Sequence, residues 1–239
     1  MKLLLLLFIM TFVGGITMNA DTLYIGKFSE MNPDEKEKPE GWDNMDFRGI
    51  SATEYKLVEF DGRNVVKAKS EQSSSGLIFR EQIDLKEYPI IEWEWYVENI
   101  MEKGDVTKED GDDYPARIYV MFDYDLGNLS WRERNTIRAL RAFYGEVPSR
   151  AINYIYANHA ELDKVVPNPY TDLVTMWVVD TGEENLRQWK SYRRNIYEDY
   201  KEIYGEEPPP VEGVAIMTDS DDTGEEAMAY FGDIRFLKE

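Results

Sequence analysis

The long run from Ile90 to Val97 alternates from Ile91 onward between core-forming residues and more polar ones, and this period of two strongly constrains the fold. In an extended strand, the residues on one face are Ile91, Trp93, Trp95 and Val97, and those on the other are Glu92, Glu94 and Tyr96. The aromatic face must be buried against a second layer. The glutamate face is left for water or for a ligand.

Several other segments are typical of short strands. Asp61-Gly62 separates two alternating runs, Glu54 to Phe60 and Asn64 to Lys69, and this is the strongest hairpin signal in the chain. Further strands are expected at Leu23 to Phe28, Leu77 to Phe79, Arg117 to Tyr124, Ala151 to Asn158, Leu173 to Asp180, Val214 to Met217 and Met228 to Leu237. In the strand that begins at Arg117, a period of two turns Ile118, Val120 and Phe122 inward and leaves Arg117, Tyr119 and Met121 on the opposite face.

Two helices are predicted between these strands. Ser130 and Glu133 have the spacing of a capping box, which predicts a helix through about Phe143 that Gly145 ends. A second helix is predicted from about Glu183 to Tyr204, with Gly205 just past its end. Its apolar stripe consists of Trp189, Tyr192, Ile196, Tyr200 and Ile203.

Because the helices interrupt the strands rather than alternate with them, the order of elements argues against a doubly wound parallel sheet. We predict a mainly β fold: an antiparallel two-sheet, jelly-roll-like sandwich with two inserted helices, formed by residues 21–239 as a single domain.

The first twenty residues have the order of a secretory signal: Lys2, the apolar run Leu3 to Val13, and a polar approach to Ala20. We expect a signal peptide over residues 1–20 and a periplasmic or extracellular product, although Met18 fits the cleavage rule poorly. No stable membrane insertion is expected once the leader is cleaved. Uncleaved, it could anchor the chain. Cysteine is absent, which excludes both a disulfide-stapled fold and an acylated N-terminal cysteine.

Charge and motif content exclude several functions. The formal net charge is −20, so binding to nucleic acid phosphates and to anionic lipids is disfavoured. His159 is the sole histidine, which excludes a zinc site built on several histidines. The sequence has neither a nucleophile elbow nor a phosphate loop.

One group of charged residues stands at the entry to the strand that begins at Arg117. A guanidinium beside the carboxylates of Asp112 and Asp113 can hydrogen-bond the vicinal hydroxyls of a sugar. The alternative is an ion pair that ties the strand to its loop. Tyr170, in the proline-containing loop from Pro167 to Asp172, is an aromatic candidate for contact with the apolar face of a sugar ring.

A second acidic group follows the strand that ends near Met217. Asp219, Asp221 and Asp222 cluster within one turn, as a hard cation such as Ca²⁺ requires, and Asp233 is a candidate partner for Asp219. The match to a calcium-binding helix-loop-helix is weak, because its twelfth position is Tyr230. The alternatives are a plain acidic turn and, for Asp233, an outward-facing position on an edge strand.

Taken together, the motifs resemble those of a bacterial family known as the domain of unknown function 3047. They run through nearly all of the mature chain and comprise Gly111 to Val120, Asn153 to Asn158, Pro167 to Asp172, Trp189 with Arg193-Arg194 and Asp199-Tyr200, Met217 to Gly224, and Gly232 to Ile234. The resemblance implies an exported bacterial protein with a sandwich fold similar to carbohydrate-binding modules, but fold alone does not fix function.

The leading hypothesis is a non-catalytic envelope module that binds a saccharide or another polyhydroxyl ligand. Its predicted binding residues are Asp112, Asp113, Arg117, Tyr119, Asn153 and Tyr170. A structural Ca²⁺ is the one cofactor considered, with Asp219, Asp221, Asp222 and Asp233 as ligands. Two alternatives stay open: a carbohydrate-active hydrolase or lyase on the same fold, and a structural or protein-interaction role in the envelope.

Overall fold

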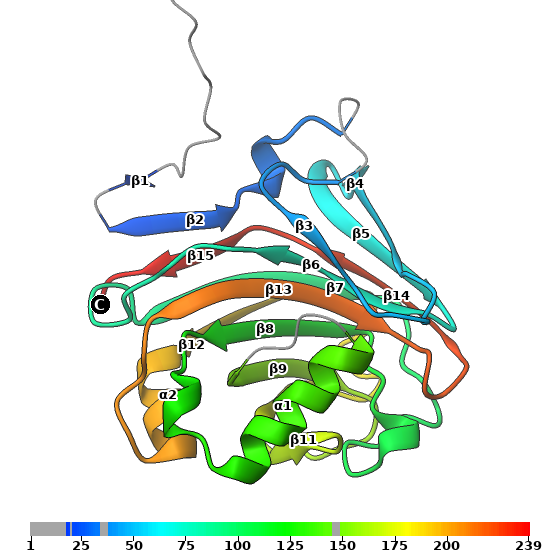
Figure 1. Cartoon of the computed structure of the whole chain (residues 1–239). Coiled ribbons are helices and arrows are strands. Elements are labelled where there is room, and N and C mark those ends of the chain that lie inside the picture. Colours follow the sequence, from blue (N-terminus) through cyan, green and yellow to red (C-terminus); the bar gives the residue numbers. More distant parts are fainter. Residues whose placement is uncertain (1–17, 20, 34–37, 145–148) are drawn as a thin grey trace, which may run out of the picture.

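The computed structural model of the chain describes residues 18–19, 21–33, 38–144 and 149–239. The predicted leader, apart from Met18 and Asn19, and the helix-ending Gly145 lie outside these residues. Within them, the strands form two sheets that stack as a sandwich (Figure 1). No helix in the described part of the chain is long and apolar enough to cross a membrane.

The first sheet, called sheet A, has eight strands, and β7 is its central strand. Sheet A contains β1 (Met18–Asn19), β2 (Thr22–Gly26), β4 (Glu54–Phe60), β5 (Arg63–Glu71), β7 (Ile90–Val97), β12 (Trp189–Asn195), β14 (Glu226–Phe231) and β15 (Ile234–Leu237). One edge of β7 pairs with β12, and β14 and β15 follow one another along the other edge.

The second sheet, called sheet B, has seven strands in the order β10-β11-β9-β8-β13-β6-β3. These strands are β3 (Asp43–Asp46), β6 (Ser74–Phe79), β8 (Ala116–Phe122), β9 (Ala151–Ala157), β10 (Val165–Asn168), β11 (Thr171–Thr181) and β13 (Val211–Asp219). Strands β9 and β11 pair in parallel, whereas all other pairs are antiparallel. The sandwich is therefore mainly rather than wholly antiparallel.

Short helices connect the strands. They are η1 (Phe28–Glu30), η2 (Glu109–Gly111), η3 (Leu126–Asn128), α1 (Trp131–Tyr144) and α2 (Ile196–Tyr204). In Figure 1 both α-helices lie at the end of the molecule away from β2, β4 and β5. Helix α1 begins where the capping box predicts and packs through Ile137 beside Leu173.

Aromatic side chains join the two sheets in the core. The ring of Trp93 on β7 lies 5.3 Å from that of Tyr154 on β9, and the ring of Trp95 lies 6.4 Å from that of Tyr156. All four side chains are buried. The alternation in β7 therefore predicts its buried face correctly, and so does the alternation in β8, whose Ile118, Val120 and Phe122 all lie in this core.

The hairpin prediction is also confirmed. Strands β4 and β5 pair in register from Glu54 opposite Lys69 to Phe60 opposite Arg63. The two turn residues, Asp61 and Gly62, have φ values of 53° and 75°. Two successive residues in the left-handed backbone conformation form a tight turn, and the twist of this turn matches that of the flanking strands.

The helix predicted from Glu183 to Tyr204 is wrong in its first half. Residues 189–195 form β12, in which Tyr192 stacks on Trp93 in the core while Arg193 on the other face pairs with Glu92. A strand lies here because β7 offers a free edge for backbone pairing, which outweighs the helical spacing of the apolar residues. The helix begins only at Ile196, where the Asn195 side chain accepts a hydrogen bond from the amide of Glu198.

The strand predicted from Met228 to Leu237 is interrupted by a bulge. Phe231 pairs with Trp95, but Arg235 pairs with Glu92, so one extra residue is accommodated around Gly232 and Asp233. The Gly232 amide still donates to the Glu94 carbonyl. This bulge sets the position of Asp233, which lies on the outward side of sheet A near Glu92 and Glu94. The strand that follows is not an edge strand, because β15 pairs with both β2 and β7.

Candidate functional site

Strand β8 carries the central residues of the candidate site on the outer face of sheet B. Arg117, Tyr119 and Met121 point away from the core, as the period of two requires, and β13 places Met217 beside Arg117 and Ala215 beside Tyr119. The site is thus built on the two central strands of a paired sheet. Rigid strands hold side chains more tightly than loops do.

Arg117 is only 1% exposed and is held on several sides. Its Nε donates to Asp219 Oδ1 at 2.9 Å, and its Nη2 donates both to Asp219 Oδ2 and to the backbone carbonyl of Asp112. Its Nη1 donates to the Tyr119 hydroxyl at 3.1 Å and lies 3.8 Å from Asp112 Oδ2. The guanidinium carbon also lies 4.3 Å from the centre of the Tyr114 ring.

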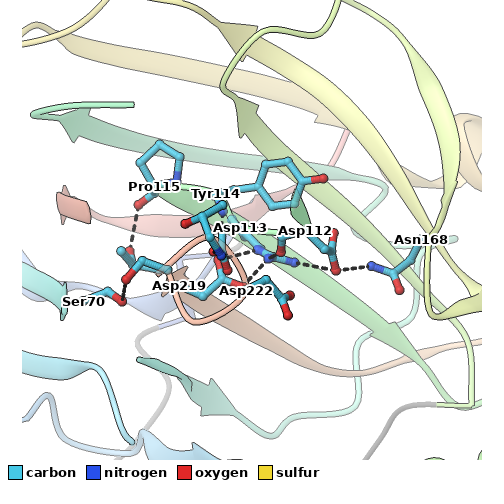
Figure 2. Close-up of polar contacts among 12 residues, drawn as sticks. Ser70, Asp112, Asp113, Tyr114, Pro115, Asn168, Asp219 and Asp222 are labelled. Carbon is cyan, nitrogen blue, oxygen red and sulfur yellow. Dashed lines mark hydrogen bonds and ion pairs between the residues drawn. The ribbon is translucent and has the colours of Figure 1, made fainter. Parts of the chain in front are cut away.

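The loop before β8 supplies two buried carboxylates, Asp112 and Asp113 (Figure 2). Asp112 Oδ2 accepts a hydrogen bond from Asn168 Nδ2 at 2.7 Å. Asp113 Oδ2 accepts one from the Thr223 amide at 2.6 Å, and its backbone carbonyl accepts one from Asn158 Nδ2. These contacts join the loop to β10 and to the turn after β13.

The turn after β13 supplies three more carboxylates. Asp219 ends the strand, Asp221 and Asp222 lie in the turn, and Gly224 closes it with a φ of 69°. Asp222 Oδ1 accepts a hydrogen bond from the Tyr170 hydroxyl at 2.8 Å. The turn therefore faces both the loop of Asp112 and the loop of Tyr170.

These elements surround a partly open cavity of about 210 Å³. Its polar walls consist of Ser74, Asp112, Arg117, Tyr119, Asn168, Tyr170, Thr171, Asp219, Asp221 and Asp222. Its apolar walls consist of Met45, Phe47, Ile50, Met121, Val174 and Met217. A concave site that combines apolar walls with converging polar groups is the usual form of a small-molecule site.

Burial and crowding of like charges raise the pKa values of the acidic groups. Burial raises the pKa of Asp112 and that of Asp219, and in both cases Arg117 opposes the shift. Burial and the nearby Asp113 raise the pKa of Asp221. Burial raises the pKa of Asp222 to about 6, with Tyr170 opposing the shift and Asp221 adding to it.

The basic and phenolic groups of the site are held in their protonated forms. Burial lowers the pKa of Arg117, but Asp219, Tyr119 and Asp112 outweigh it, so the pKa lies well above its ordinary value. Burial raises the pKa of Tyr119 to about 12, against the opposing effect of Arg117. At neutral pH, Arg117 is therefore a fixed cation and Tyr119 a neutral hydroxyl.

The structure brings most of the sequence-predicted residues to this one cavity. The lining includes Asp112, Arg117, Tyr119 and Tyr170 from the predicted ligand set, and Asp219, Asp221 and Asp222 from the predicted metal set. Asp113 does not line the cavity, because its side chain is turned toward Thr223. Most of the predicted ligand-binding residues and most of the predicted metal ligands, which the sequence analysis treats as two sites, therefore form one cluster.

Asn153 and Asp233 lie apart from the cavity lining. Asn153 on β9 is opposite Tyr119 and fully buried, and neither atom of its side-chain amide has a hydrogen-bond partner among the residues that the structure describes. Asp233 lies in the bulge between β14 and β15, where it accepts hydrogen bonds from the amide and hydroxyl of Ser29 at 2.9 and 2.6 Å. It borders a different cavity, together with Glu92 and Glu94.

Sequence reasoning missed two features of the site. It paired Arg117 with Asp112 and Asp113, whereas the main partner is Asp219, two residues beyond the position that pairs with Arg117 in the sheet. It also passed over Asn168. The predicted loop from Pro167 to Asp172 is in fact the end of β10, a turn of two residues that includes Tyr170, and the start of β11, and Asn168 is the last residue of β10. The signal that could have identified Asp219 is the period of two in β13, which puts Asp219 on the same face as Met217, the residue that pairs with Arg117 on β8.

Comparison with known protein families assigns this chain to one of them. A family model with the description "Protein of unknown function (DUF3047)" matches residues 40–235. The chain belongs to this family. The DUF3047 match includes every residue of the cavity described above. No curated protein matches the chain.

Several solved structures are similar to this DUF3047 protein. The family 11 carbohydrate-binding module of a cellulosomal cellulase of Clostridium thermocellum has a TM-score of 0.43 and 8% identity, over 93% of this chain and 97% of that one. The K1 cleaved adhesin domain of Lys-gingipain from Porphyromonas gingivalis has a TM-score of 0.37 and 9% identity, over 91% and 98%. A low-affinity xylan-binding module from Roseburia intestinalis has a TM-score of 0.30 and 10% identity, over 83% and 96%. Because these TM-scores are low, the proposals below stand on the residues of this chain alone.

Proposed function

We propose that this chain is an exported protein of the bacterial envelope that binds a small saccharide or similar polyhydroxyl compound without converting it. The observation that carries the proposal is the cavity over β8 and β13, in which buried polar groups converge between apolar walls. Its volume, about 210 Å³, is below the range of drug-sized sites and suits a ligand of about one sugar ring.

The walls offer both kinds of contact that a sugar ring needs. Carboxylate oxygens of Asp112 and Asp222 accept hydrogen bonds from ligand hydroxyls, and the Tyr119 hydroxyl is a second kind of polar contact. Met121 and Val174 form part of the apolar wall against which the C–H face of a ring packs. Such polar groups fix orientation, whereas the apolar walls exclude water.

The charges of the cavity favour some saccharides over others. Asp112, Asp219, Asp221 and Asp222 line the cavity, and among the described residues Arg117 is the only cationic side chain in the lining. The donors of Arg117 are directed to Asp219, Asp112 and Tyr119. A uronic acid would add a further negative charge to this excess, so neutral and amine-bearing sugars are the expected ligands.

The alternative of a hydrolase or lyase rests on one observation. Asp222 borders the cavity and has a pKa raised to about 6, in the range of a general acid at neutral pH. A binding module holds its ligand unchanged, whereas an enzyme would release product. The third alternative, a structural or protein-interaction role, predicts that no saccharide binds at all.

Isothermal titration of the mature protein with neutral, amine-bearing and acidic monosaccharides tests the proposal. We expect binding of a neutral or amine-bearing sugar and a loss of at least about tenfold in affinity for Asp222→Asn or Tyr170→Phe, since each removes a charge or hydroxyl at the wall. Asp61→Asn, at the exposed hairpin tip, and Tyr197→Phe on α2 are the matched controls. If titration with every one of these sugars gives no heat of binding, the proposal is refuted. If product forms and Asp222→Asn abolishes its formation, the alternative of a hydrolase or lyase is favoured.

Export is tested separately. We expect the product of the full-length gene in a bacterial host to reach the periplasm or the medium, with Asp21 as its first residue. Mass spectrometry of the fractionated cells identifies both the compartment and the N-terminus. An intact leader on a protein retained in the cytoplasm would refute this part of the proposal.

A further inference from the structure

Three carboxylates meet where the loop before β8 faces the turn after β13. Asp113, Asp219 and Asp221 each offer one oxygen that lies within 4.8 Å of the oxygens from the other two. Asp113 and Asp219 are buried, and Asp221 is partly buried beside the cavity. We call these residues the carboxylate triad.

One member of the triad carries an unsatisfied oxygen. Asp113 is fully buried, and its Oδ1 has no hydrogen-bond partner in the described part of the chain, while its Oδ2 accepts from the Thr223 amide. An anionic oxygen that is buried without a partner is costly, and native proteins rarely retain one without a compensating group. This oxygen points to a missing positive partner independently of the clustering.

The nearby cations do not supply that partner. Arg117 directs its donors to Asp219, Tyr119 and Asp112, and none of its hydrogen bonds reaches Asp113 or Asp221. The ammonium of Lys103 donates to the Thr223 carbonyl at 2.8 Å. The triad together with Asp112 and Asp222 therefore places five carboxylates around one guanidinium.

We propose that the carboxylate triad binds a divalent hard cation, and that this cation is Ca²⁺. All of the offered donors are oxygens, which Ca²⁺ and Mg²⁺ prefer, and Ca²⁺ accepts irregular geometry whereas Mg²⁺ demands a near-ideal octahedron. Asp219 already accepts two hydrogen bonds from Arg117 and one from the Tyr114 amide, so it contributes less than Asp113 and Asp221.

The cation would join two segments that also form the cavity. Asp113 is next to Asp112, and Asp221 is next to Asp222, and both of those neighbours line the cavity. Binding at the triad therefore holds the two loops at a fixed separation. The cation does not depend on the proposed saccharide, since its ligands are all residues of the protein.

Thermal melts of the mature protein after chelator treatment test the site with the metal alone. A ligand that binds only the native state raises Tm according to its concentration relative to Kd, so Ca²⁺ at ten times Kd should raise Tm by about 3–5 °C. Mg²⁺ at the same concentration should raise it less. Competition by Ca²⁺ against bound Tb³⁺, followed by luminescence, gives a second readout.

Two variants separate a metal site from a structural cluster. Asp113→Asn keeps the acceptor for the Thr223 amide and removes the unsatisfied charge, so its Tm without metal should equal or exceed that of the wild type. Asp221→Asn is the milder change, because this side chain is only partly buried. Both should lose the Ca²⁺ response, whereas Asp61→Asn should keep it.

The proposal is overturned if Ca²⁺ leaves the wild-type Tm unchanged, or if both triad variants respond to Ca²⁺ as the wild type does. Saccharide titrations with and without chelator distinguish this outcome from failure of the proposed function. Binding of a sugar in chelator, with no response to Ca²⁺, would overturn the cation site alone. A response to Ca²⁺ without any sugar binding would support the cation site and leave the saccharide proposal refuted.

Discussion

Replacement of Arg117 by methionine tests whether the cluster around it depends on a buried ion pair. The side chain is 1% exposed and donates through Nε and Nη2 to both oxygens of Asp219. Removal of one partner from a buried pair costs about 3–5 kcal/mol, because the other charge is left uncompensated. For a chain of this size each kcal/mol lowers Tm by about 2–4 °C, so Arg117→Met should lower Tm by about 6–20 °C.

The sign of the pH dependence follows from Asp219. Its pKa is already raised by burial, and Arg117 opposes that shift, so the pKa rises further in the variant. A carboxyl group with a raised pKa in the folded state is stabilised while protonated and loses that contribution as the pH rises toward the folded pKa. The deficit of Arg117→Met should therefore be smaller at acid pH than at pH 8.

Calorimetry or circular dichroism melts across this pH range measure both quantities. Arg193→Met is the matched control, because Arg193 pairs with Glu92 at a side-chain exposure of 54%, and surface pairs contribute only about 0–1 kcal/mol. The double variant Arg117→Met, Asp219→Asn should recover part of the loss, since it removes both charges. A Tm for Arg117→Met close to that of Arg193→Met at pH 8 would refute the reasoning.

Three further changes have definite expected outcomes. Asp222→Asn should make the free energy of unfolding less dependent on pH between about 4 and 6. The pKa of Asp222 is raised to about 6 in the folded state, so the stability that its protonated form contributes is lost as the pH rises through that range. Urea denaturation at several pH values measures this, and the same pH dependence in variant and wild type would contradict it. Asn195→Ala removes the acceptor for the Glu198 amide and should cost about 1 kcal/mol in urea denaturation, with no change expected if α2 begins elsewhere. Tyr154→Phe removes the buried hydroxyl that donates to Asp199 Oδ2 at 2.6 Å and should cost about 1–3 kcal/mol; a melt identical to the wild type would show that the bond contributes nothing.

Local pattern was enough to predict the fold class and several of its strands. In β7 exposure alternates along the strand, and in β8 the apolar residues Ile118, Val120 and Phe122 at every second position enter the core between the sheets, so the period of two in the sequence identifies the inner face of both strands. The Asp61-Gly62 hairpin is likewise a local signal. Strand β12 was missed because its identity depends on pairing with β7, and no pattern within residues 189–195 reports the presence of that partner.

The candidate site was predicted in composition but not in connectivity. Its carboxylates, Arg117 and Tyr170 were all recognisable as a surplus of polar groups at the ends of strands. The bond between Arg117 and Asp219 joins residues 102 positions apart and follows from the register of β8 on β13. The bulge at Gly232 and Asp233, which places Asp233 against Ser29, likewise depends on pairing with β7.

The place of β13 has a consequence for how the protein is made. This strand lies between β6 and β8 in sheet B, yet it is synthesised long after both of them. Until residues 211–219 emerge, both neighbours present unpaired edges to other chains, and Arg117 has no counter-ion from Asp219. Nascent or truncated chains that stop before Val211 should therefore aggregate rather than accumulate as a smaller folded unit. A host that translocates the polypeptide in an unfolded state would avoid this aggregation.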